Sequence, residues 1–179
     1  GASCFGKEPM PRAGIVHPMA LPPQLLHRFL CRNLTRGRPH APGRAVLVAD
    51  SGVWIDFFSG TPSPAADELA QLLQAGEWRI VVPDLVMFEV LRGFRFEADF
   101  RRAHALIAGF DIESTGGPAL ALAAGQHYRA LRSAGYTIRN APDVLLAAFC
   151  IDRDYALLHN DRDFLAFESL RGLKGWSPL

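Results

Sequence analysis

Short apolar segments alternate with longer amphipathic segments along most of this chain, and this alternation restricts the fold more than any other feature. The short segments have the length and apolar character of buried strands, and they comprise residues 46–49, 79–83, 110–113 and 155–159. The longer segments have helical spacing, and they comprise residues 64–75, 84–94, 97–108, 118–134 and 144–151. Strands that are connected through helices pair in parallel, with right-handed crossovers. The sequence therefore predicts a three-layer α/β/α domain with a mainly parallel central sheet of about five strands.

Two local expectations accompany this fold. Residues 54–58 are expected to lead from the first strand into a turn and loop at residues 59–64, which are rich in Pro, Ser and Gly. In the helix at residues 84–94 the expected apolar stripe leaves Glu89 to one side, and it consists of Leu85, Phe88 and Leu91.

Charge and composition divide the chain near residue 44. Its 179 residues, 49% of them hydrophobic, suffice for one domain with a full core. Seven of the 19 Lys and Arg lie in residues 1–44, which hold only one of the 18 Asp and Glu, so the remainder is acidic. Residues 1–44 are also rich in Pro, and we expect a basic, disordered or weakly structured leader there, followed by a domain at residues 45–179. A basic arm that contacts RNA is the alternative for the leader.

Cysteine usage and hydropathy favour a cytoplasmic protein. Cys4, Cys31 and Cys150 are odd in number, far apart and without the spacing of metal ligands, which fits a reducing compartment with Cys150 in the core. The one early apolar patch, at residues 25–30, is interrupted by charge and too short to cross a membrane.

Four acids stand at positions that an α/β sheet brings together. Asp50 and Asp161 follow predicted strands, Asp143 opens a predicted helix, and Glu89 lies in the helix after the second strand. Clustered carboxylates cannot all remain ionised without a cation, because like charges raise each other's pKa. All-oxygen ligands favour Mg²⁺ or Mn²⁺ over Zn²⁺. Such a site suits the hydrolysis of a phosphodiester bond.

Each acid also has a purely structural explanation. Asp50 and Asp143 are suited to capping helices, and the acids near Asp161 fit a solvent-exposed loop. Glu89 lies among apolar residues, where burial is costly without a partner. A phosphatase of the haloacid-dehalogenase type normally needs a second Asp at position 52, which is Gly here. A receiver-type signalling domain needs a Lys, and outside the leader only Lys174 is present.

The sequence also contains four motifs in a fixed order. They are VLVADSGVWIDFF at residues 46–58, VPDLVMFEVLRGF at 82–94, TIR at 137–139 with DVLLAA at 143–148, and LLHNDRDF at 157–164. Together they resemble the PIN-domain ribonucleases, and more narrowly the VapC toxins of bacterial toxin–antitoxin pairs. Residues 1–44 have no counterpart in that family.

The resemblance implies a Mg²⁺- or Mn²⁺-dependent endoribonuclease toxin that cleaves tRNA, rRNA or mRNA, is inhibited by a VapB-type antitoxin and forms a homodimer. It implies that the catalytic acids are Asp50, Glu89, Asp143 and Asp161. Of these, Asp50, Asp143 and Asp161 would bind the metal directly, whereas Glu89 and Asp163 would act through water. Ser51 and Asn160 would support the acids. A catalytically weak PIN-fold protein that binds RNA or an antitoxin is the alternative.

The remaining candidates concern the substrate. Arginines near the acids could bind flanking phosphates or could pair with local acids, and they are Arg92, Arg95, Arg139 and Arg162. His159 is expected to be a buried, hydrogen-bonded residue rather than a general base. Trp54, Phe57 and Phe58 are expected in the core or in protein contacts rather than stacked on bases.

Overall fold

The strands form one parallel sheet with β1 at its centre. The computed structural model describes residues 45–176, and the sheet has the order β3-β2-β1-β4-β5 with every neighbouring pair parallel. The strands are β1 (Val46–Ala49), β2 (Arg79–Pro83), β3 (Asp111–Glu113), β4 (Ala156–Leu158) and β5 (Lys174–Gly175). This confirms the predicted α/β fold and its parallel sheet. The predicted leader at residues 1–44, with Cys4 and Cys31, lies outside the described residues.

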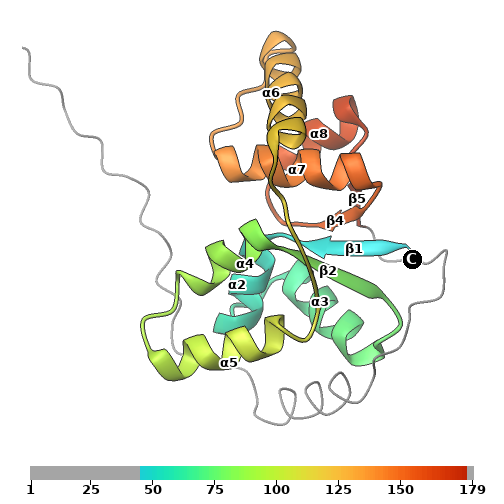
Figure 1. Ribbon diagram of the computed structural model, residues 1–179. Coiled ribbons are helices and arrows are strands. Elements are labelled where there is room, and N and C mark those ends of the chain that lie inside the picture. Colours follow the sequence, from blue (N-terminus) through green and yellow to red (C-terminus); the bar gives the residue numbers. More distant parts are fainter. Residues whose placement is uncertain (1–44, 177–179) are drawn as a thin grey trace, which may run out of the picture.

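Helices cover both faces of the sheet and complete the three layers (Figure 1). One face carries α2 (Ser51–Ser59), α3 (Pro64–Ala75), α4 (Asp84–Leu91) and α5 (Glu97–Ile107). The other carries α6 (Pro118–Ser133), α7 (Ala141–Arg153) and α8 (Asp163–Arg171). No helix within residues 45–176 is both long enough and apolar enough to cross a membrane.

The strand order reverses at β1, and this fixes where a ligand site can form. The chain builds outward from β1 through β2 to β3, and then crosses over to add β4 and β5 on the other side of β1. In open parallel sheets the crevice at such a reversal, beyond the carboxyl ends of the strands, is the usual binding site. Leu47, Val48 and Ala49 are fully buried, and the N–H of Asp50 donates to the Leu158 carbonyl at 2.9 Å. The residue after β1 is therefore held firmly beside β4.

Two helices were not predicted from the sequence. Residues 51–59 form α2, although no helix was expected there, because Asp50 caps a helix whose Trp54 and Phe58 are both fully buried. The expected turn and loop follow this helix. The Trp54 and Phe58 rings stack one turn apart, with centroids 5.9 Å from each other. Burial of a Phe side chain contributes about 2 kcal/mol. Helix α8 is anchored in the same way by the buried rings of Phe164 and Phe167.

Helix α4 corrects a second expectation. It ends at Leu91 rather than at residue 94, and Phe88, expected in a buried stripe, is 61% exposed. Leu91 is buried as predicted, and the rest of the buried face is formed by Val86, Glu89 and Val90. Glu89 precedes Val90 and is turned inward with it, so the carboxylate is buried and the aromatic ring is not.

Candidate active site

Three of the four predicted acids are buried at the strand reversal. Asp50 follows β1, Glu89 lies in α4 and Asp143 lies in the first turn of α7, and their exposures are 8%, 9% and 6%. Within residues 45–176 the only other buried polar side chain is Thr115. Asp161, on the connection from β4 to α8, is exposed. The buried acidic side chains thus come from three separate elements and lie in one region of the structure.

The Asp50 carboxylate is both a helix cap and a buried charge. Its Oδ2 accepts a hydrogen bond from the Gly52 N–H at 3.2 Å, whereas Oδ1 is buried without a hydrogen-bond partner among the described residues. Burial raises the pKa of Asp50 to about 6, and the charge of Glu89 adds to this effect. The backbone N–H groups of Gly52 and Ser51, together with His159, lower that pKa in opposition. The structural explanation of Asp50 is therefore correct, but it accounts for only one of the two oxygens.

Asp143 shows that the acids act on one another. Burial raises its pKa to about 7, and the negative charges of Asp50, Asp161 and Glu89 add to the rise. The amide of Asn140 opposes it by donating to Asp143 Oδ1 at 2.7 Å. Because Coulombic effects weaken with distance, Asp143 must lie near each of the other three acids.

The other predicted polar residues are arranged less directly. The Asp163 N–H donates to Asp161 Oδ1 at 2.9 Å, so Asp161 stabilises the turn that precedes α8. Asp163 Oδ2 accepts from the Arg139 N–H at 3.5 Å. Asn160, predicted to support the acids, instead donates to the Ser63 hydroxyl at 3.2 Å, at the start of α3. Asn160 is therefore placed as a tie between α3 and the loop after β4.

The chemistry of this cluster fits a hard divalent cation, although its geometry is open. The donors are carboxylate oxygens, and the orphaned Oδ1 of Asp50 is a buried acceptor that lacks a positive partner. Within residues 45–176, however, no three His, Cys, Asp or Glu side chains are close enough together to form a ready metal-ligand set. The residues present suit Mg²⁺ or Mn²⁺ in kind, but they do not form a closed ligand shell.

The four predicted arginines fall into two pairs. Arg92 lies 4.0 Å from Glu89 and over the Phe88 ring, and Arg95 lies over the Phe96 ring. Arg139 and Arg162 are exposed, and their guanidinium groups make no ion pair or hydrogen bond with any part of the chain that the structure describes.

The histidine and aromatic predictions are confirmed. The His159 side chain is 9% exposed and its Nε2 lies 2.8 Å from Glu168 Oε1, as expected for a buried, hydrogen-bonded residue. Trp54 and Phe58 are fully buried and Phe57 packs on the core. Cys150 is buried as well.

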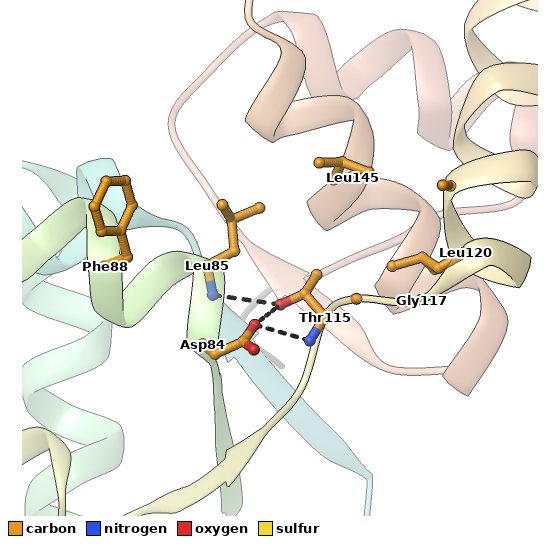
Figure 2. Close-up of a pocket in the computed structure, with 9 residues that line it drawn as sticks. Asp84, Leu85, Phe88, Thr115, Gly117, Leu120 and Leu145 are labelled. Carbon is orange, nitrogen blue, oxygen red and sulfur yellow. Dashed lines mark hydrogen bonds between the residues drawn. The ribbon is translucent and has the colours of Figure 1, made fainter.

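Sequence reasoning missed two groups at this site. Asn140 stands three residues before Asp143, a helix-start spacing that could have suggested its role. The second is Asp84, whose Oδ1 accepts from both the N–H and the hydroxyl of Thr115 (Figure 2). This pair fastens the start of α4 to the connection between β3 and α6. It borders a 490 Å³ pocket into which Leu85, Leu120 and Leu145 project.

Comparison with known proteins identifies the family. The model of the PIN domain matches residues 47–170. The chain belongs to the PIN-domain family. Its PIN domain is 29% identical over 132 residues to the VapC ribonuclease Mb1587 of Mycobacterium bovis and to the ribonuclease VapC11 of Mycobacterium tuberculosis. Each alignment covers 74% of this chain and 98% of the relative.

Solved structures agree with the fold of this PIN domain. VapBC2 from Rickettsia felis, bound to a DNA fragment from its promoter, superposes with a TM-score of 0.58 at 17% identity, over 74% of this chain and 99% of that one. FitAcB from Neisseria gonorrhoeae also gives 0.58, at 15% identity, over 73% and 96%. At these identities the structures support the fold alone.

Proposed function

We propose that this PIN-domain protein is a VapC-type toxin, a metal-dependent endoribonuclease that hydrolyses RNA phosphodiester bonds. The observation that carries the proposal is the burial of Asp50, Glu89 and Asp143 at the strand reversal, within electrostatic reach of Asp161. The similarity to two proteins named VapC ribonucleases supports the same reaction. A structural role alone does not explain why a fold would bury three carboxylates together, since each costs free energy without a cation.

The acids would bind the metal in two ways, directly or through water. Asp50, Asp143 and Asp161 would hold Mg²⁺, or Mn²⁺ in its place, with Glu89 and Asp163 acting through water. The bound cation would supply positive charge for the reacting phosphate and would acidify a water molecule. The N–H of Gly52 fixes Asp50, and the amide of Asn140 fixes Asp143, so that both carboxylates keep their direction when RNA enters.

The partners follow from the same proposal. A VapB-type antitoxin would restrain the enzyme, and two copies would form a homodimer in the cytoplasm, where tRNA, rRNA or mRNA is the substrate. The structural neighbour from Rickettsia felis is named VapBC2, which supports an antitoxin of this type. The acidic cluster gives such a partner a clear target, because a basic side chain would compete with the cation there.

RNA cleavage by the purified protein tests the proposal. Total RNA is incubated with the protein and Mn²⁺ or Mg²⁺, and new 5′ ends are mapped. Asp50→Asn and Asp143→Asn should each abolish the new ends, since they remove charge but retain the size of the side chain. Asp67→Asn is the matched control, because Asp67 is an exposed first-turn acid of α3 outside the cluster. Full activity of both cluster variants would overturn the proposal.

A further inference from the structure

A second pocket, of 290 Å³, lies between the α6–α7 connection and α8. Its walls combine an aromatic ring, a guanidinium, a carboxylate and hydroxyls with apolar side chains, and they include Tyr136, Thr137, Arg162, Asp163, Leu165 and Ser169. This mixture of flat apolar surface and polar groups suits a small planar ligand that also forms hydrogen bonds. Apart from Asp163, the proposed cleavage reaction assigns no role to the residues of this pocket.

The pocket is linked to the acid cluster through Asp163, which lines it, and through the connection between α6 and α7. Arg162 stands between Asp161 and Asp163 in the chain, and Asp163 accepts the backbone N–H of Arg139. The next residue, Asn140, donates to Asp143. One connection therefore forms a wall of the pocket and also positions a buried acid, so a ligand in the pocket would lie beside the proposed cleavage site.

The segment that forms one wall of the pocket carries only basic charge, whereas the facing wall holds both Arg162 and Asp163. Residues 114–142 contain no Asp or Glu, but they contain Arg129, Arg132 and Arg139. Several other guanidinium groups in the described chain pair with acids, as Arg79 does with Asp111 at 2.9 Å. Exposed and unpaired arginines beside a site are typical of phosphate contacts.

Tyr136 provides a fixed aromatic surface. Its side chain is 46% exposed, although a tyrosine ring would gain by burial. Its backbone is not loose, because the Tyr136 N–H donates to the Leu131 carbonyl at 2.9 Å, after Gly135 turns the chain with φ +90°. An exposed ring on a fixed backbone is the arrangement that stacks unpaired bases in proteins that bind single-stranded RNA.

We propose that this pocket is a nucleotide subsite that seats one base of single-stranded RNA next to the cleaved phosphodiester. Tyr136 stacks on the base, and Arg139 and Arg162 contact the adjoining phosphates. The subsite rests on the proposed ribonuclease function and adds to it the direction from which the strand enters, over the side of α6 and α8.

RNA binding without cleavage tests the subsite. A short fluorescein-labelled single-stranded oligoribonucleotide is titrated with the full-length protein in EDTA, and fluorescence anisotropy gives Kd. Tyr136→Ala should weaken binding about ten-fold, whereas Tyr136→Phe, which keeps the ring, should bind as the wild type does. Arg162→Gln should weaken binding and reduce the slope of log Kd against log salt by about one.

Matched controls come from α5, which lies on the opposite face of the sheet. Arg101 and Arg102 are exposed arginines of α5, so Arg101→Gln and Arg102→Gln should leave Kd unchanged. Tyr136→Leu, with circular dichroism, replaces Tyr136→Ala should the latter fail to fold.

Unchanged Kd in the Tyr136 and Arg162 variants, or no binding by the wild type, would overturn the subsite. So would unchanged Kd with an altered oligomeric state by light scattering, which would assign the pocket to a protein contact. The ribonuclease proposal would fail by a different result, namely that the wild-type protein does not cleave RNA in the presence of Mn²⁺.

Discussion

Raising the pH in the absence of divalent cations should destabilise this protein, because its buried acids prefer to be protonated. Asp50 has a pKa of about 6 and Asp143 one of about 7 in the folded chain, against 3.8 for an ordinary Asp. A folded-state pKa above the unfolded value means that the folded state binds protons more tightly. The resulting stabilisation is complete below about pH 3.8 and is lost as the pH rises through 6 to 7.

The magnitude can be worked out for Asp50. Between pH 5 and pH 8 the loss from Asp50 alone is about 1.4 kcal/mol, since its folded pKa lies one unit above the lower pH and one pKa unit is worth about 1.4 kcal/mol. Asp143 acts in the same direction. The two contributions are not additive, because each acid raises the pKa of the other.

Urea unfolding in EDTA at pH 5 and pH 8, followed by the fluorescence of the tryptophans, measures this loss. The free energy of unfolding should fall between the two values, and Mg²⁺ or Mn²⁺ added at pH 8 should restore it. Asp50→Asn and Asp143→Asn should each flatten the dependence on pH. A wild-type protein whose pH dependence matches that of both variants would refute the reasoning.

Two further substitutions test single contacts. Asn140→Ala removes the donor 2.7 Å from Asp143 Oδ1, so the pKa of Asp143 should rise further. Cleavage at neutral pH should then slow by about ten-fold, with the acidic limb of the pH–rate profile moved upward, and an unmoved profile would contradict this role. Thr115→Val removes the hydroxyl that donates to Asp84 and should lower the free energy of unfolding by about 1–2 kcal/mol in urea, whereas Thr115→Ser should retain most of it.

The parts of the fold that depend on neighbouring residues could be predicted from the sequence. Strand β1 is a buried apolar run closed by Asp50, and α3 begins at a Ser–Pro cap and ends at Gly76 in the left-handed conformation. In each case the signal lies within a few residues of its effect. The positions of Asp50, Glu89 and Asp143 at one end of the sheet followed from the predicted order of strands and helices.

The parts that were missed depend on contacts between distant segments. Helix α2 is stabilised by the packing of Trp54 on Phe110 and of Phe58 on Phe94, and its aromatic run has no strong helical propensity of its own. Asn160 binds Ser63, a residue 97 positions away, instead of the acids. Such pairings are set by how layers pack, and a spacing rule along one segment carries no information about them.

The strand order places the proposed catalytic acids on two different halves of the chain. Asp50 and Glu89 belong to the half that builds β1, β2 and β3, whereas Asp143 and Asp161 belong to the half that adds β4 and β5. A single link, residues 114–117, joins the halves, and Figure 1 shows it running from β3 up to α6. Neither half alone contains all four of the proposed acids. The proposed site can therefore assemble only after Asp161 has been synthesised and β4 has paired with β1.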